Sequence, residues 1–269
     1  MTDVRALGLG LYAITAREIA RFLRQRERLL SSLVRPMLWL AVFATGLNDL
    51  LGVSIIEPYE TYTSYQEYIM PGLIGIIVLF QSMQSALSMV YDREAGVMRV
   101  MLVSPLPRHY LLFAKILGAS LLGLLQVYAF VAVAWLFDVG LPPVGLVLML
   151  PAVLLAGLML GSLGLVVSVY TRQIENFAGM MNFVIFPMFF FSSALYPLWK
   201  LRESGAIWIW WLARLNPFTH AVELARYTAY GRFPPVSAAV VVTVALVAFA
   251  LAVRGYDPAR GAIRRVRRG

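Results

Sequence analysis

Long runs of apolar residues without Asp, Glu, Lys or Arg dominate the chain. A helix needs about 20 mostly apolar residues to cross the hydrocarbon core of a bilayer. Backbone groups in lipid must form their hydrogen bonds internally, and the runs lack the alternation of a membrane barrel, so each run predicts a spanning helix. Five strong runs cover residues 68–91, 116–137, 139–171, 176–199 and 233–253. A weaker sixth run covers residues 33–51 and has Arg35 and Asp49 near its ends.

The composition agrees with this pattern. Apolar residues make up 60% of the 269 positions and charged residues 14%, against about 45–50% and about 25% in soluble domains. One soluble core of this size could not bury so much apolar side chain, which excludes a soluble enzyme, a disordered chain and a coiled coil. The absence of cysteine excludes disulfides, thiolate metal sites and a cysteine nucleophile. The sequence therefore predicts an all-α polytopic membrane protein.

A single transmembrane domain over residues 1–269 is expected. It comprises a leader at 1–32, six spans within 33–253 and a basic tail at 254–269. With this arrangement, eighteen of the 23 Lys and Arg residues lie on one side of the membrane, and the other five lie between Trp199 and Phe233. The positive-inside rule then places both termini in the cytoplasm. The net charge of +9 is explained by membrane topology, so the expected partner of these charges is membrane lipid and not nucleic acid.

The leader has an amphipathic pattern. Its basic residues recur at spacings of four, three and four, with apolar residues on another face, which is typical of a helix lying in the membrane interface. A simple positively charged topogenic leader is the alternative. The basic residues are Arg17, Arg21, Arg24 and Arg28.

The connection after the run at 68–91 combines a charge cluster with a short helical pattern that ends at a Ser-Pro step. A charged cytoplasmic helix with an exposed apolar face suits docking into a groove of a partner protein. An ordinary reversal loop with solvated charges is the alternative. The residues singled out are Asp92, Arg93, Glu94, Gly96, Val97, Met101, Leu102, Ser104 and Pro105.

A second informative segment precedes the last span. Asn216 and Pro217 predict a helix start, with Asn as the N-cap and Pro in the first turn. Four tryptophans between residues 199 and 211 favour the headgroup level of the bilayer. We therefore expect short outer helices that dip partly into the membrane and return, with Arg214, Glu223 and Arg226 pairing with one another or with lipid headgroups. A surface-lying helix without a direct role is the alternative.

Some residues within the spans are candidates for lining a transport path. Polar side chains in lipid turn towards other helices or towards a water-filled path, so helix–helix contacts remain an alternative. A run of Met and Phe at 180–191 could hold a greasy ligand or face lipid. The path candidates are Gln81, Gln84, Ser85, Ser88, Asn182, Phe183 and Phe186.

The order of these features resembles the membrane subunit of the type-2 ATP-binding-cassette (ABC) exporters. The matching motifs are Asp92-Arg93-Glu94-x-Gly96 with Ser104-Pro105, and Asn216-Pro217 followed by Arg226. Relatives of this kind export drugs, polysaccharides or nodulation factors. Residues 88–108 also resemble permeases associated with alcohol oxidation by quinoprotein dehydrogenases.

The resemblance implies that two permease copies pair and that each docks an ATPase subunit through residues 92–105 and the leader. ATP and Mg would be bound by the ATPase and not by this chain, which has no G-x-x-x-x-G-K-[ST] segment. It also implies the inner membrane of a bacterium and a path lined by the second and fifth spans.

Two other function classes stay open at this point. One is a polytopic membrane enzyme acting on a lipid or lipid-linked substrate, for which His220 and Glu223 are the candidate pair. The other is an assembly factor that binds a partner and transports nothing.

Overall fold

The computed structural model describes residues 8, 10–13, 15–17, 19–20, 34, 36–42, 57–59, 63–94, 107–171 and 174–255. These residues form helices and connecting turns, without a strand among them. The helices with defined boundaries are α3 (Tyr65–Glu94), α5 (Arg108–Trp135), α6 (Pro143–Leu148), α7 (Leu150–Tyr170), α8 (Ile174–Phe190), α9 (Leu198–Glu203), α10 (Ile207–Leu215), α11 (Pro217–Ala229) and α12 (Pro235–Gly255).

The predicted all-α polytopic membrane fold is confirmed. Within the described residues, four helices are long and apolar enough to cross a membrane: α3, α5, α12 and the stretch Pro143–Tyr170 that joins α6 to α7. A fifth apolar helix, α8, has 17 residues. Of the weak run at 33–51, only residues 34 and 36–42 are described, and these are helical. The count of six spans therefore stays a prediction.

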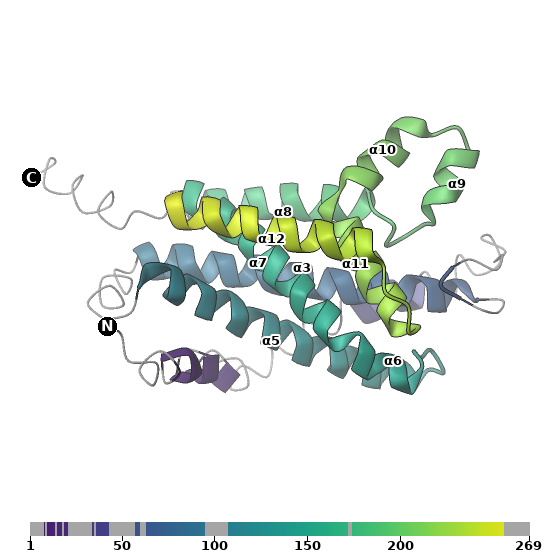
Figure 1. The fold of residues 1–269 in the computed structure, drawn as a ribbon, viewed down its shortest axis with the longest axis horizontal. Helices are drawn as coiled ribbons and strands as arrows, with labels where there is room; N and C mark the ends of the chain where they lie inside the picture. The colour runs from purple at the N-terminus through teal and green to yellow at the C-terminus, as the bar shows by residue number, and fades with distance from the viewer. Residues whose placement is uncertain are drawn as a thin grey trace, which may run out of the picture.

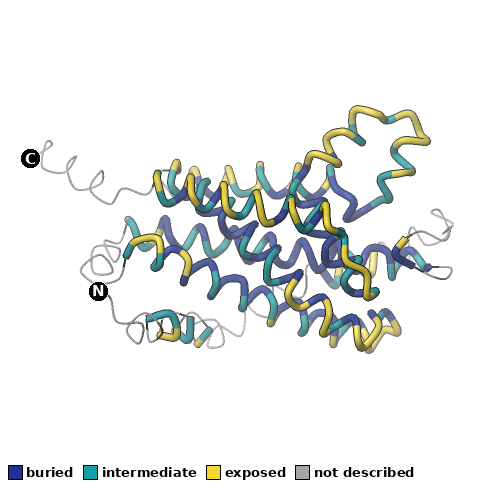
Figure 2. The backbone as a smooth tube through the Cα atoms, viewed as in Figure 1, coloured by how far each residue is buried: buried dark blue, intermediate teal, exposed yellow. Residues whose placement is uncertain are grey.

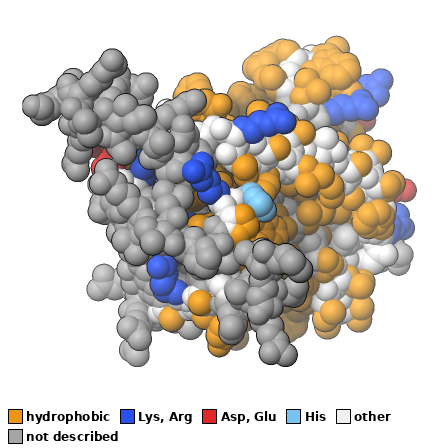
Figure 3. Space-filling model, turned by 60° about the vertical axis from the view of Figure 1, so that its left-hand side comes forward, with side chains coloured by type: hydrophobic (Ala, Val, Ile, Leu, Met, Phe, Trp, Pro, Cys, Tyr) orange, Lys and Arg blue, Asp and Glu red, His pale blue; other side chains and the backbone are white. Residues whose placement is uncertain are grey.

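The long helices form one elongated bundle (Figure 1). α7 packs against α3, α5 and α12, and α3 packs against α5 and α8. Burial is concentrated where these helices meet, as the dark blue tube in Figure 2 shows. α12 is the least enclosed of the spanning helices, and it exposes several large apolar side chains, among them Val236, Leu246 and Val247, as expected for a lipid-facing surface. Hydrophobic side chains cover much of the described surface in Figure 3.

Small residues on α7 allow a close helix contact in the bundle. A Cβ at Gly157 would lie 2.8 Å from the Cβ of Ser120, and a Cβ at Gly161 would lie 2.4 Å from the Cγ2 of Ile116. Both neighbours belong to α5. The glycine spacing thus brings the backbone of α7 onto α5, as small residues do in membrane helix pairs.

One predicted span boundary is wrong. The run at 139–171 forms the spanning stretch Pro143–Tyr170, with an internal break at Met149 between α6 and α7. The run at 176–199 was expected to continue to Trp199, but α8 ends at Phe190 and the chain turns through residues 191–196. Polar side chains bind the backbone where this helix ends. Ser192 Oγ donates to the carbonyl oxygen of Phe189 at 2.6 Å, and the Asn216 side chain, between α10 and α11, binds two carbonyls at the end of α8, as described next.

Candidate functional site

The charge cluster at the end of α3 is built into the bundle. Asp92 forms an ion pair with Lys115 of α5, whose side chain is only 6% exposed. Arg93 donates to the carbonyl oxygen of Ser168 at 3.2 Å and to that of Thr171, which lie in and just after the last turn of α7. These are orphan carbonyls of a helix C-terminus, where a cation is favoured. Arg93 therefore closes the end of α7.

Glu94 links the same cluster to α8. Its Oε1 accepts a hydrogen bond from the backbone N–H of Ile174, the first residue of α8, at 3.2 Å. A carboxylate at a helix N-terminus satisfies an unpaired N–H group and stabilises the helix dipole. We call Asp92, Arg93, Glu94 and Lys115 the anchor. The anchor joins the end of α3 to α5, α7 and α8 at one end of the bundle.

Several predicted site residues lie outside the described residues. They are Arg21, Arg24 and Arg28 of the leader and Gly96, Val97, Met101, Leu102, Ser104 and Pro105 of the connection after α3. Arg17 is described and lies in a helical stretch of the leader. The docking and in-plane roles of these residues stay predictions.

The path candidates on α3 and α8 fall into three groups by burial. Gln81 is buried between helices, where its Oε1 accepts a hydrogen bond from Gln126 Nε2 of α5 at 3.2 Å. Gln81 therefore serves as a helix–helix contact and does not face an open path in this chain. Gln84, Ser85 and Ser88 are half-buried. Asn182, Phe183 and Phe186 of α8 are exposed, and Phe183 is 81% exposed.

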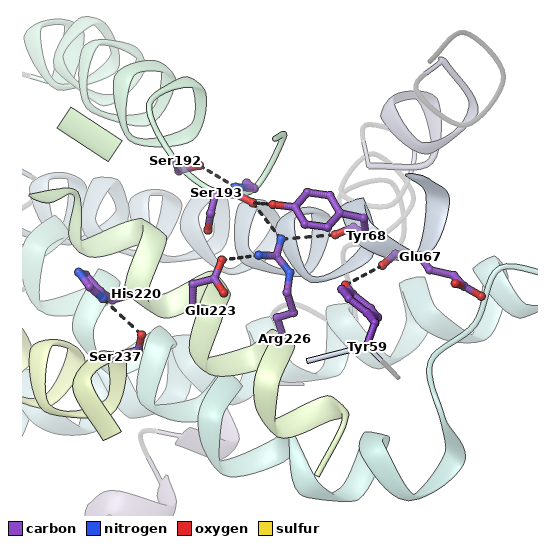
Figure 4. A network of polar contacts seen from close by, with 10 residues as sticks. Tyr59, Glu67, Tyr68, Ser192, Ser193, His220, Glu223, Arg226 and Ser237 are labelled. Carbon is purple, nitrogen blue, oxygen red and sulfur yellow. Dashed lines mark hydrogen bonds and ion pairs between the residues drawn. The ribbon is translucent and has the colours of Figure 1, made fainter. Parts of the chain in front are cut away.

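A second polar cluster lies at the opposite end of the bundle (Figure 4). Arg226 of α11 is 2% exposed and forms an ion pair with Glu223, one turn earlier. Its Nη2 donates to the carbonyl oxygen of Ser193 at 2.9 Å and to that of Tyr68 at 3.4 Å. Its guanidinium carbon lies 4.2 Å from the centre of the Tyr68 ring. Tyr68, Ser193, Glu223 and Arg226 are called the clasp.

The clasp holds the turn that follows α8 from both sides. Tyr68 donates its hydroxyl to the carbonyl oxygen of Ser193 at 2.9 Å, and Tyr65 donates to that of Leu195 at 2.7 Å. Contact with α3 is so close at this point that a Cβ at Gly72 would lie 2.4 Å from the carbonyl oxygen of Ala194. The turn thus runs between α3 and α11 with its carbonyl groups satisfied by side chains.

Asn216 completes the connection between α8 and α11. Its Oδ1 accepts from the backbone N–H of Phe218 at 2.9 Å, which confirms the predicted N-cap. Its Nδ2 donates to the carbonyl oxygens of Met188 at 2.7 Å and Phe191 at 2.6 Å. One side chain therefore starts α11 and closes the end of α8.

Tyr59 borders the clasp from the segment before α3. Its ring packs against Tyr230, with 4.6 Å between ring centres. Burial raises the pKa of the Tyr59 hydroxyl to about 12, although the nearby Arg226 guanidinium lowers it. The hydroxyl therefore stays protonated at neutral pH and donates to the carbonyl oxygen of Glu67 at 3.5 Å.

The residues of the enzyme alternative do not converge. His220 lies between Ser237 Oγ, 3.3 Å from its Nδ1, and the carbonyl oxygen of Arg214, 3.0 Å from its Nε2. Glu223 is engaged with Arg226 instead, as Figure 4 shows. An acid–base pair must meet at one reacting atom, and these two side chains are held by different partners.

Replacing Asn216 tests the double role of its side chain. We expect Asn216→Ala to lower the free energy of unfolding in detergent by about 1–3 kcal/mol, because a cap is lost and two buried carbonyls lose their donor. Asn216→Asp keeps the acceptor for Phe218 and loses both donated bonds, so it should retain part of the stability. Asn182→Ala on the exposed face of α8 is the matched control. Equal stability of N216A and N182A would contradict the assignment.

Comparisons with known proteins agree with this architecture. A family model described as ABC-2 type transporter matches residues 10–230. The chain is 26% identical over 260 residues to the inner membrane transport permease YadH of Escherichia coli, covering 90% of this chain and 92% of YadH. It is 27% identical over 223 residues to the putative transport permease ycf38 of Cyanophora paradoxa, covering 81% and 73%. The probable multidrug ABC transporter permease YbhR of E. coli is 26% identical over 172 residues, covering 62% and 45%.

Proposed function

The chain belongs to the ABC-2 type transporter family, and from this premise we propose that it works as an exporter. As a membrane permease subunit of an ABC transporter, it is associated through its family with ABC ATPase subunits. Two permease copies pair, and each docks one ATPase. The substrate leaves the cytoplasm along a path between the spans.

The anchor is the observation that carries this proposal. The segment that the resemblance assigns to ATPase docking starts at Asp92, and the first three residues of that segment are tied to α5, α7 and α8. A displacement of this segment would be transmitted to α5, α7 and α8 together. Packed helices respond to such a push by rigid-body shifts between discrete arrangements. Closure of the ATPases would therefore tilt the spans and switch access to the path.

The exposed face of α8 is the surface that supports pairing. Asn182, Phe183 and Phe186 lie on this helix without burial in the described part of the chain. In the proposed dimer they face the second copy and the path, together with the half-buried Gln84, Ser85 and Ser88 of α3. A mixed Met, Phe and amide surface adapts to differently shaped apolar ligands.

The proposed location is the inner membrane of a bacterium, with both termini in the cytoplasm. The name of the relative YadH supports that membrane, and the positive-inside rule supports the orientation. The anchor end then faces the cytoplasm and the clasp end faces outward. ATP and Mg are bound by the partner ATPase.

The division of labour between the two chains can be measured directly. Purified chain alone should show no saturable, Mg-dependent ATP binding, because the sequence has no phosphate-cradling P-loop. Reconstitution with its ATPase should give ATP hydrolysis coupled to export. Equilibrium dialysis with labelled ATP, with the ATPase as the positive control, checks the first part. Saturable binding to the permease alone would overturn it.

A further inference from the structure

Helices α9 and α10 form an arm that projects from the clasp end of the bundle (Figure 1). α10 packs on α9 and on α11, and its other face is largely exposed, although the ring of Trp208 contacts that of Phe191. That face is apolar, with Trp208 64% and Leu215 74% exposed. The full face comprises Ile207, Trp208, Trp211, Leu212 and Leu215.

Two arginines meet at one tryptophan beside this face. The guanidinium carbon of Arg202 lies 5.9 Å from the centre of the Trp210 ring, and that of Arg214 lies 5.0 Å from it. Arg214 also lies 5.8 Å from the centre of the Trp211 ring. Both arginines are exposed, and neither forms an ion pair with a described acidic residue. Two like charges are therefore gathered at one indole, and an anion bound there would offset their repulsion.

We propose that the arm binds an anionic phospholipid, with its phosphate held by Arg202 and Arg214 over Trp210 and its acyl chains under the apolar face of α10. A guanidinium offers several N–H groups in a planar fork that matches a phosphate. The adjoining tryptophan, isoleucine and leucine side chains are the type that enters the headgroup region of a bilayer.

Charge and surroundings favour a lipid over a protein partner. The arm carries Lys200, Arg202 and Arg214 against Glu203 alone, so its excess positive charge complements anionic headgroups. α8, which precedes the arm, also exposes apolar side chains near its C-terminal end, among them Phe186 and Phe190. The orientation proposed above decides which leaflet supplies the lipid. The lipid contact itself does not depend on that orientation or on transport.

Tryptophan fluorescence can report this contact, because four of the six tryptophans lie at positions 199–211. Replacing the other two, by Trp39→Phe and Trp135→Phe, leaves tryptophan only in the arm. The full-length double variant is reconstituted in phosphatidylcholine vesicles. A fraction of the lipid is either phosphatidylcholine or phosphatidylglycerol brominated near the carbonyl end of its acyl chains. Bromine quenches the tryptophans that it contacts.

We expect brominated phosphatidylglycerol to quench more strongly than brominated phosphatidylcholine at equal mole fraction. Each arginine should raise the local occupancy of the anionic lipid by about fivefold. Arg202→Gln with Arg214→Gln should abolish this preference and leave quenching by both lipids at the phosphatidylcholine level. Arg108→Gln with Arg254→Gln, an equal charge change on exposed residues at the opposite end, should preserve the preference.

Two results would overturn the proposal. Equal quenching by both lipids before the arginines are replaced would show that the arm has no anionic headgroup site. Quenching by acrylamide in water, with none by either brominated lipid, would show that the arm stands outside the bilayer and is free for a soluble partner.

Discussion

Replacing Arg226 by leucine is expected to lower the free energy of unfolding by about 3–5 kcal/mol, because a buried charge pair that loses one partner leaves the other charge without compensation. Glu223 would remain with its side chain 19% exposed and no cation. The carbonyl oxygen of Ser193 would also lose the guanidinium that binds it. Denaturant titration of the purified chain in detergent, followed by circular dichroism, measures the change.

Three further variants separate the charge pair from the packing around it. Glu223→Leu together with Arg226→Leu removes both charges and should recover most of the loss. Arg226→Lys keeps the charge but has no planar fork to bind Glu223 and Ser193 together, so it should fall between the two. Arg232→Leu breaks the exposed pair with Glu57 and should cost about 0–1 kcal/mol. A loss for R226L no larger than that for R232L would show that the clasp does not hold this end together.

Reversing the charge of Glu94 is expected to uncouple ATP hydrolysis from transport while the spans stay inserted. Glu94→Arg removes the acceptor for the N–H of Ile174 and places a second cation beside Arg93 at the start of α8. Coupling between two sites is commonly worth 5-fold to 150-fold in an equilibrium. We therefore expect transport per ATP hydrolysed to fall by about tenfold. Gly96→Pro in the adjoining connection should act in the same direction.

The matched control is Glu175→Arg. Glu175 is an exposed acid in the first turn of α8, one residue beyond Ile174. The same charge reversal there changes the field at the helix start without removing the Glu94 bond, so it should leave coupling close to the wild-type value. The ratio of transport to ATP hydrolysis in proteoliposomes containing both subunits is the quantity to compare. Unchanged transport by the Glu94→Arg complex would reject the proposed coupling role of this residue.

The spanning helices could be predicted because lipid imposes a simple rule. An apolar run near 20 residues must be a helix, since its backbone has no other hydrogen-bond partner. The end of α8 could not be found this way, because the uncharged run continues past Phe190 to Trp199. What ends the helix is the Asn216 side chain, which donates to carbonyls 25 and 28 residues earlier in the chain.

The clasp was predictable only in part. The spacing of Glu223 and Arg226 predicts their pairing on one helix face, and the structure confirms it. Tyr68 and Ser193 were missed because they accept hydrogen bonds from Arg226 through their backbone carbonyls. Every residue carries a backbone carbonyl, so the sequence gives no signal for this contact. A tyrosine at the first turn of a span and a Ser-Ser pair within an apolar run were the available hints. The burial of Lys115 against Asp92 was likewise hidden, because helix contacts between distant residues depend on packing angles.

The most direct test of the account is to purify the solubilised chain from its native membrane and identify its partner by mass spectrometry. The account predicts that an ATP-binding-cassette subunit is recovered with the wild-type chain. Recovery of that subunit should fall for Glu94→Arg and for a polar replacement of Met101, and should persist for Glu175→Arg. Recovery of the chain alone as an intact dimer would contradict the transporter mechanism proposed here.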